Sequence, residues 1–522
     1  MEHAGAQESV LGPSTRGSRA APPSLLPMLN FSLGSVHLPP TPTFPKFTLR
    51  RRWVSAGLVG MGVLLFGLVL WEGTWVPRWA DEAVVLAEKP QPAPLSNATD
   101  AAGDGALFQD LYGTEYSHLR PVHYLADPPT ANFRDALRND TKYLTSFLSA
   151  GFTNDVMTIA NMVFLAMVTS RVPIIPPFTS HINAVADPLT FSDIFDVPRL
   201  ARALNAPILE WADVKDLAAA EAQRESGQDE VGCWNIWEVD NVFAEGPRGS
   251  FTARVLNLDI SYTRAPASVK LIPDFEHDSH SSFWALARLD APNASAEILA
   301  DPVAHPTRLT EQGHALPPDE QLLCYDYVYY LCASEPFEYE LDHYPAWNFV
   351  LRHFHWTSDL EQLGKTYLRR TFQLLDDAPI PPFIAIHARR GDFANWCGEA
   401  SRDTCFPPLS TFNHCVDEIR AELLGTRGIA SDTPIPVVLT SDERDETWWG
   451  AVAEVGWLRV DHARERTVER YGAFYPVVLD AVVQSFATGF VGTERSTFST
   501  LARRRVTDWN RGVVRMAKWG AG

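Results

Sequence analysis

The sequence predicts an α/β protein with two domains, each built on a parallel sheet, behind one N-terminal membrane-spanning helix. The chain has 522 residues, too many for a single hydrophobic core. Short apolar runs rich in branched residues alternate with helical periodicity, as in parallel strands linked by helices. Residues 53–71 form an uncharged, largely apolar run long enough to span a bilayer as a helix.

Composition excludes several classes of protein. Hydrophobic residues make up 46% of the chain and charged residues 21%, which is typical of a globular protein. The net charge of −20 argues against a nucleic-acid partner. The basic excess of residues 1–52 leaves the remainder even more acidic, so any anionic ligand there needs a local cationic pocket.

The N-terminal region predicts a single-pass type II membrane protein. Residues 1–52 are expected to be a disordered cytosolic tail, 53–71 the anchor and 72–106 an extended stem. Arginines 50–52 precede the anchor and acidic residues follow it, which places the C-terminal part in the lumen of the Golgi or endoplasmic reticulum.

The luminal part carries features of secreted proteins. All six cysteines follow the anchor, and an even number in an oxidising compartment allows disulfides. Their connectivity stays open, although Cys397 and Cys405 are close in sequence. Sequons at Asn97, Asn139 and Asn293 predict a glycoprotein.

The first domain is expected at residues 107–355. Residues 143–148 predict a strand, 149–154 a turn, 155–170 a helix and 172–176 a second strand. The turn lies at the carboxyl edge of the sheet, so it is either a ligand loop with Asn154 facing a cleft or an ordinary helix cap. Residues 180–350 look irregular, and 349–375 predict a helix leading to the second domain.

The second domain is expected at residues 356–522, where an apolar strand from Ile384 ends in a cationic turn. His387, Arg389, Arg390, Gly391 and Asp392 follow at the carboxyl end, where ligands bind in open α/β sheets. The planar fork of arginine suits phosphate oxygens, and two arginines suit a diphosphate. The alternatives are a strand-end salt bridge and an exposed Arg-Gly-Asp turn.

Two later strand ends carry further candidates. The strand 437–439 leads to Asp442, whose carboxylate is able to accept two N–H bonds from guanine, or else caps a helix. A helix over 475–488 and a strand over 489–492 precede Ser496 and Thr497, which open a last helix through Arg505. Their hydroxyls and the free amides there form either a phosphate site or ordinary caps.

Four ordered blocks resemble the GDP-fucose-dependent protein O-fucosyltransferases. They are Gly151-Phe152-Thr153-Asn154, His387-Ala388-Arg389, Asp442 and Ser496-Thr497-Phe498. The resemblance implies a GT-B type fold with two Rossmann-like domains facing across a cleft. The first domain would form the acceptor side and the second would bind the GDP-sugar.

The resemblance also implies roles for residues. Arg389 and Asn154 are the expected catalytic residues. The expected GDP-sugar-binding residues are His387, Arg389, Arg390, Asp392, Asp442, Ser496, Thr497, Phe498, Gly151 and Phe152. No metal ligand or cofactor is expected, since the sequence has no Asp-x-Asp.

The implied function is inverting, metal-independent transfer of fucose from GDP-fucose to a hydroxyl of a protein or glycan. Family members acting on folded modules carry Arg or Glu just before the phenylalanine, where this chain has Ala150 and Gly151. The acceptor and any general base therefore stay open. Two alternatives are an inactive membrane-anchored luminal binding protein and a transferase using another nucleotide sugar.

Overall fold

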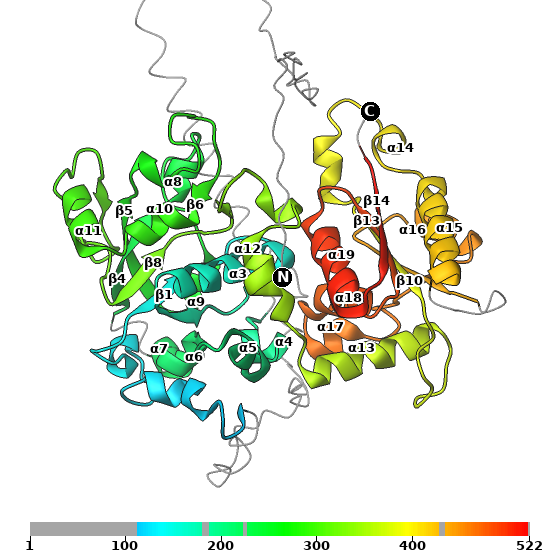
Figure 1. Cartoon of the computed structure of the whole chain (residues 1–522), viewed down its shortest axis with the longest axis horizontal. Coiled ribbons are helices and arrows are strands. Elements are labelled where there is room, and N and C mark those ends of the chain that lie inside the picture. Colours follow the sequence, from blue (N-terminus) through cyan, green and yellow to red (C-terminus); the bar gives the residue numbers. More distant parts are fainter. Residues whose placement is uncertain (1–111, 180–186, 223–226, 427–433, 520–522) are drawn as a thin grey trace, which may run out of the picture. The chain divides into compact units, whose positions relative to one another are not determined.

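The computed structural model describes residues 112–179, 187–222, 227–426 and 434–519, all within one compact unit. The predicted tail, anchor and stem lie outside these residues. Within them, no helix is both long and apolar enough to span a bilayer. The described residues form a mixed α/β structure with two large, mostly parallel sheets, as predicted (Figure 1).

The first large sheet has the strand order β3-β2-β1-β8-β4-β5-β7, with only the edge strand β7 antiparallel. Its strands are β1 Tyr143–Ser146, β2 Val172–Ile175, β3 Leu209–Glu210, β4 Asp229–Asn235, β5 Leu258–Arg264, β7 Thr307–Arg308 and β8 Leu322–Tyr325. A small separate pair joins β6 Ser281–Ser282 to β9 Leu331–Cys332.

The second large sheet has the order β12-β11-β10-β13-β14 and is wholly parallel. Its strands are β10 Ile384–Ala388, β11 Val437–Ser441, β12 Leu458–Arg459, β13 Gly489–Thr493 and β14 Val513–Ala517. The chain runs outward from β10 through β11 to β12, then returns to build β13 and β14 on the other side. The carboxyl ends of β10 and β13 therefore flank a topological switch point, where such sheets bind ligands.

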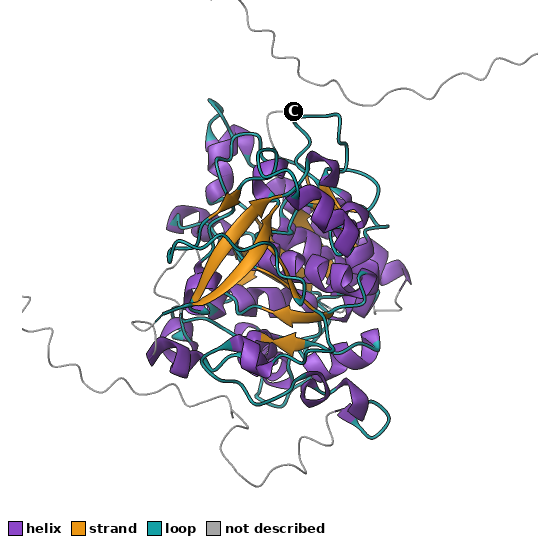
Figure 2. Ribbon diagram, turned by 90° about the vertical axis from the view of Figure 1, so that its left-hand side faces the viewer, coloured by secondary structure: helices purple, strands orange, loops and turns teal. Residues whose placement is uncertain are grey.

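Helices cover both large sheets (Figure 2). The α-helices are α3 Phe152–Val168, α4 Phe191–Ile194, α5 Val197–Leu204, α6 Trp211–Val214, α7 Leu217–Ala222, α8 Trp237–Asp240, α9 Phe251–Val255, α10 Phe283–Arg288, α11 Pro292–Leu299, α12 Pro345–Phe349, α13 Ser358–Thr371, α14 Arg402–Cys405, α15 Leu409–Thr426, α16 Glu446–Glu454, α17 Thr467–Tyr471, α18 Tyr475–Ser485 and α19 Thr497–Asn510. Short 3-10 turns are η2 Ser117–Leu119, η3 Pro121–Tyr124, η4 Phe133–Ala136, η6 Ala267–Val269, η7 Glu338–Glu340, η8 Leu351–His353 and η9 Asp392–Trp396.

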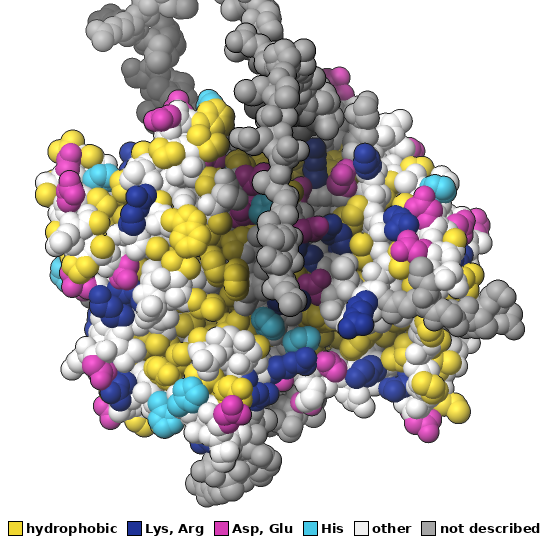
Figure 3. Space-filling view, in the orientation of Figure 1, with side chains coloured by type: hydrophobic (Ala, Val, Ile, Leu, Met, Phe, Trp, Pro, Cys, Tyr) yellow, Lys and Arg dark blue, Asp and Glu magenta, His cyan; other side chains and the backbone are white. Residues whose placement is uncertain are grey.

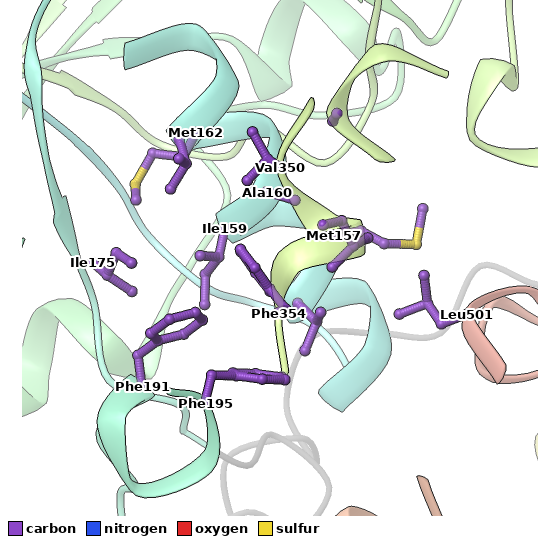
Figure 4. Close-up of a cluster of buried hydrophobic side chains, with 14 of the residues drawn as sticks. Met157, Ile159, Ala160, Met162, Ile175, Phe191, Phe195, Val350, Phe354 and Leu501 are labelled. Atoms are coloured by element: carbon purple, nitrogen blue, oxygen red, sulfur yellow. The ribbon is translucent and has the colours of Figure 1, made fainter. Parts of the chain in front are cut away.

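One apolar core joins the two sheets. It runs from Leu144 of β1 through α3 to α18 and α19, and on to Ala385 of β10. In Figure 4, Met157 of α3 lies beside Leu501 of α19 within this core. Separate clusters fill the opposite face of each sheet. Since α3 is buried along most of its length, packing fixes where its N-terminus lies relative to α19.

Most predicted elements around the ligand loops are confirmed, with shifts of one to three residues at their ends. The helix predicted over 349–375 is confirmed only in part: α13 covers Ser358–Thr371, and it begins there because the side chain of Thr357 accepts the N–H of Leu360 and caps it. The irregular appearance of 180–350 was also misleading, since this stretch supplies β3, β4, β5 and β8. Disulfides join Cys233 to Cys324, on neighbouring strands, and Cys397 to Cys405, as sequence proximity suggested.

Replacing Asn161 by alanine should destabilise the core between α3 and the chain that follows β8. The side chain of Asn161 is fully buried, donates to the carbonyls of Val328 and Tyr329 at 2.9 Å each, and accepts the hydroxyl of Tyr344. Asn161→Ala leaves these three groups unpaired, so the free energy of unfolding should fall by about 3 kcal/mol in urea titrations. Asn413→Ala, on the surface of α15, is the control, and equal losses in both variants would contradict this account.

Candidate functional site

The switch point of the second sheet brings the chain after β10 against the chain after β13. The backbone N–H of Arg389 donates to the Thr493 hydroxyl at 3.0 Å, and that hydroxyl donates to the carbonyl of His387 at 2.9 Å. These bonds extend the pairing of β10 with β13 beyond the strands themselves. Two blocks that are about 100 residues apart in sequence therefore form one edge, as predicted.

His387 contacts the start of α19. Its Nδ1 lies 2.7 Å from the Ser499 hydroxyl, which accepts the backbone N–H of Thr493 at 2.9 Å, and its ring lies 4.6 Å from that of Phe498. Burial, followed by the charge of Arg389, lowers the pKa of His387 from 6.5 to about 3, while Asp442 acts in the opposite direction. His387 is therefore a neutral imidazole at physiological pH.

The guanidinium of Arg389 is held by two carboxylates. One terminal nitrogen lies 2.7 Å from Asp392 and the other lies 2.7 Å from Asp442. The Arg389 side chain is 28% exposed, so it is partly accessible to a ligand. No hydrogen bond joins its fork to residues 496–498 within the part of the chain that the structure describes. The contact with the start of α19 is made by His387 instead.

Asp442 organises the turn that carries both arginines. One of its oxygens accepts the N–H groups of Arg390 and Gly391 at 2.8 and 3.0 Å, while the other pairs with Arg389. A Cβ atom at Gly391 would lie 2.6 Å from an Asp442 oxygen, so only glycine allows this approach. Asp442, the carboxylate predicted to bind guanine, is thus bonded to Arg389, Arg390 and Gly391 in this structure.

Arg390 is committed to packing contacts that the sequence did not predict. Its guanidinium lies 4.9 Å from the ring centroids of both Phe406 and Trp448, and its Nε donates to Glu443 at 2.8 Å. The Arg390 side chain is only 11% exposed. These contacts make Arg390 a support for the turn rather than a free phosphate ligand.

Glu443 is a residue that sequence reasoning missed. Besides Arg390, it accepts from Arg402 at 2.7 Å and from the N–H groups of Arg444 and Asp445. Burial alone would raise the pKa of Glu443, but the bonds from Arg390 and from the backbone outweigh burial and lower the pKa. An acidic residue after Asp442 carried no signal, because its two side-chain partners, Arg390 and Arg402, are distant in the sequence.

The loop after β1 meets the start of α19. The Thr497 hydroxyl donates to Oδ1 of Asn154 at 2.6 Å and lies 3.0 Å from the Thr153 hydroxyl. Asn154 is inside the first turn of α3, since Gly151 is the N-cap residue. Phe152 is buried, with its ring 5.6 Å from Phe178 and 5.8 Å from Phe474. The structure thus joins the predicted ligand loops of the two sheets directly.

Ser496 caps α19, because its side chain accepts the N–H of Ser499 at 3.4 Å, and it is buried. The sequence left open whether this serine caps the helix or binds phosphate, and the cap is the arrangement present. The N–H of Ser499 in the first turn of α19 is therefore paired within the protein.

Residues 248–250 form hydrogen bonds with the loop after β1. Arg248 donates to the carbonyl of Ser149 at 2.9 Å, the Ser149 hydroxyl donates to the carbonyl of Gly249, and the Ser250 hydroxyl donates to that of Leu148. No sequence pattern predicted these hydrogen bonds. They fix the position of residues 148 and 149, which precede Asn154 in the loop.

Asp155 supports the same loop from within. One of its oxygens accepts the N–H of Ala150 at 3.0 Å, whereas the other is buried without a hydrogen-bond partner among the described residues. Burial raises the pKa of Asp155 well above its usual value, opposed by N–H groups of Ala150 and Ser149 and by the charge of Arg248. In the described ranges, no three His, Cys, Asp or Glu side chains are arranged to hold a metal.

A family model described as GDP-fucose protein O-fucosyltransferase matches residues 143–507, well over half of the chain. The match begins at β1 and ends within α19, so it spans every block discussed above. No curated protein matches this chain.

Solved structures that match this chain include fucosyltransferases. POFUT1 in complex with GDP-fucose has 13% sequence identity and a TM-score of 0.43, with coverage of 74% of this chain and 99% of that chain. The NodZ α-1,6-fucosyltransferase soaked with GDP-fucose has 13% identity and a TM-score of 0.33, covering 70% and 93%. NodZ from Bradyrhizobium gives 14% identity at the same TM-score and coverage.

The buried imidazole should make stability depend on pH in a defined direction. The folded-state pKa of His387 is below its unfolded value, so the unfolded chain binds more protons between about pH 6.5 and pH 3. The contribution of neutral His387 to the free energy of unfolding is fully present above about pH 6.5 and is lost as the pH falls. Urea unfolding at several pH values should show the stability advantage of the wild type over His387→Asn shrinking from pH 7 to pH 4. A difference that stays constant would show that His387 is not neutral and buried in the native state.

Proposed function

This chain belongs to the GDP-fucose protein O-fucosyltransferase family, and on that premise we propose that it transfers fucose from GDP-fucose to a hydroxyl of a protein or glycan acceptor. The chain is a glycosyltransferase of the fucosyltransferase type. The proposal adds that transfer needs no metal, inverts the anomeric centre, and takes place in the Golgi or endoplasmic reticulum. The main support for this proposal is the hydrogen bond from Thr497 to Asn154, which joins the loop after β1 to the start of α19.

Charge development sets what the site must do. As the bond between fucose and GDP breaks, positive charge spreads over the sugar ring and negative charge grows on the β-phosphate. Without a metal, cationic and N–H donors must stabilise that phosphate. Arg389 is the guanidinium available for this role, because Arg390 is enclosed by Phe406, Trp448 and Glu443. The amides at the start of α19 supply further donors.

Donor binding must change the partners of Arg389. Its fork is occupied by Asp392 and Asp442, and Asp392 is 59% exposed. A diphosphate offers stronger, bidentate acceptors than a solvated carboxylate, so it would take the place of Asp392. If Asp442 also separates from the Arg389 guanidinium, one of its carboxylate oxygens is free to accept N–H groups of guanine. The other oxygen would still accept the backbone N–H groups of Arg390 and Gly391.

The acceptor hydroxyl needs little activation, since an oxocarbenium-like sugar is strongly electrophilic. Attack from the face opposite GDP inverts the anomeric centre. Asn154 lies at the junction of the two sheets and is placed to orient either the sugar or the incoming hydroxyl. Asp155 is too enclosed for direct proton transfer, because its side chain is 1% exposed.

Nucleotide selectivity tests the proposed donor. Thermal shift with GDP, UDP, GDP-fucose and GDP-mannose should show stabilisation by the guanine nucleotides but not by UDP. A donor-hydrolysis assay should then single out GDP-fucose. Stabilisation by UDP alone would replace this proposal with a transferase for another nucleotide sugar.

Arg389→Ala should reduce transfer by about 10²–10³-fold, the usual effect of removing one donor that acts on transition-state charge. The fold should stay intact by circular dichroism, because the Arg389 side chain is partly exposed. Arg515→Ala is the matched control, since Arg515 also pairs with two carboxylates, those of Glu418 and Glu422, on α15. Near-wild-type turnover of the Arg389 variant would refute its assignment.

A further inference from the structure

Arg505 is a buried cation that forms no ion pair with any residue in the part of the chain that the structure describes. It lies on α19 at 1% exposure, and its Nε and one terminal nitrogen have no hydrogen-bond partner among the described residues. Its guanidinium lies 4.4 Å from the ring centroid of Trp356 and 5.7 Å from that of Trp509. Burial lowers the pKa of Arg505 to about 9, so the side chain is still charged at neutral pH. Such a charge normally has an anionic partner.

Three more basic side chains belong to this region: His355, on which the charge of Arg505 acts, and Arg199 and His353, whose charges also act on His355. The His355 ring is stacked at 4.4 Å on Trp509, and the N–H of Asp196, which caps α5, donates to the His355 carbonyl. Burial, then the charges of Arg199, His353 and Arg505, lower the pKa of His355 to about 4. Hereafter the Arg505 cluster means Arg199, His353, His355 and Arg505.

Two carboxylates of this region already accept hydrogen bonds from protein N–H groups. Asp508 accepts the indole N–H of Trp347 at 2.8 Å and lies 3.9 Å from Arg352, while Asp196 accepts the N–H of Arg199. Arg352 and Arg199 together also lower the pKa of His353, after burial. On the face drawn in Figure 3, histidine side chains lie beside basic ones in the lower middle, where Figure 1 shows α4 and α5.

We propose that the Arg505 cluster is a binding site for a phosphate-type oxyanion, separate from the GDP-fucose site. Exposed Arg199 and the half-buried histidines would contact the anion, and Arg505 would supply charge from beneath them. Arg389 and Asp442 are not part of the cluster, so the inference does not depend on the proposed function. The shared chemistry is a tetrahedral dianion, either free inorganic phosphate or a phosphate monoester.

Binding should be linked to protonation. The groups facing His355 are Arg199 from α5, His353 beside it in sequence, and Arg505 from α19, all of which oppose its protonation. A bound dianion offsets these charges and favours the imidazolium. Binding should therefore move protons onto His355. Because the second ionisation of a phosphate monoester has a pKa of about 6, a ligand bound as the dianion gives up protons, so uptake by His355 is measured as the difference between the wild type and His355→Asn.

The test is isothermal titration calorimetry of the full-length protein, saturated with GDP, using inorganic phosphate and glycerol phosphate in two buffers of different ionisation enthalpy. Two results at pH 6.5 support the site: more protons taken up by the wild type than by His355→Asn, and binding about tenfold weaker in Arg199→Ser. A tenfold change corresponds to about 1.4 kcal/mol, the scale of one lost charge-assisted hydrogen bond. His355→Asn should reduce the proton uptake. Arg420→Ser, a surface arginine of α15, should bind as the wild type does.

Arg505→Met tests the buried charge, because methionine fills an apolar site without needing an anion. Loss of phosphate binding together with unchanged or higher thermal stability supports the inference. The background variant Arg389→Ala should bind phosphate normally, which separates this site from the donor site. Binding of glycerol phosphate indicates an esterified ligand, and binding of phosphate alone indicates the free ion. Absence of phosphate binding in the wild type, or equal proton uptake by the wild type and His355→Asn, would overturn the proposal and leave Trp356 and Trp509 as the aromatic partners of Arg505.

Discussion

The site depends on the hydrogen bonds that the Thr497 hydroxyl makes with Thr153 and Asn154. Thr497 opens α19 at the carboxyl edge of the second sheet, and Asn154 lies in the first turn of α3 at the corresponding edge of the first sheet. The positive ends of both helix dipoles therefore lie near this point. The packing of α3 against α19 in the shared core keeps the two helix starts together (Figure 4).

Around this contact, the polar groups that a GDP-sugar would use already have protein partners. Arg389 is paired with Asp392 and Asp442, and the Thr497 hydroxyl is bonded across the two sheets. Ligand binding is then an exchange of partners rather than the filling of unpaired groups, which keeps buried polar groups satisfied in the free protein. This arrangement favours an anionic ligand, such as a nucleotide diphosphate, whose negative charge replaces that of the carboxylates paired with Arg389.

Local patterns in the sequence located the parts of the site but not their pairing. The apolar run that ends at His387 predicted β10 and its cationic turn, because burial and a sharp change of polarity are both visible over ten residues. The contact of Asn154 with Thr497 joins residues 343 positions apart, and the family resemblance assigned both residues to one site without predicting this contact. Nothing in the sequence indicated that Trp448 and Glu443 enclose Arg390. Arg390 was therefore predicted to bind the GDP-sugar, a role that its contacts in the structure do not favour. Strands β4 and β5 were missed because their polar residues interrupt the apolar pattern.

A double-mutant cycle on Asn154 and Thr497 tests most directly whether the two sheets contribute to one catalytic site. The values of kcat/KM for fucose transfer would be compared among the wild type, Asn154→Ala, Thr497→Val and the double variant. If these residues act together, their effects should be non-additive, with a coupling energy of roughly 1 kcal/mol or more. Effects that simply add would show that the two loops work independently and would contradict the account.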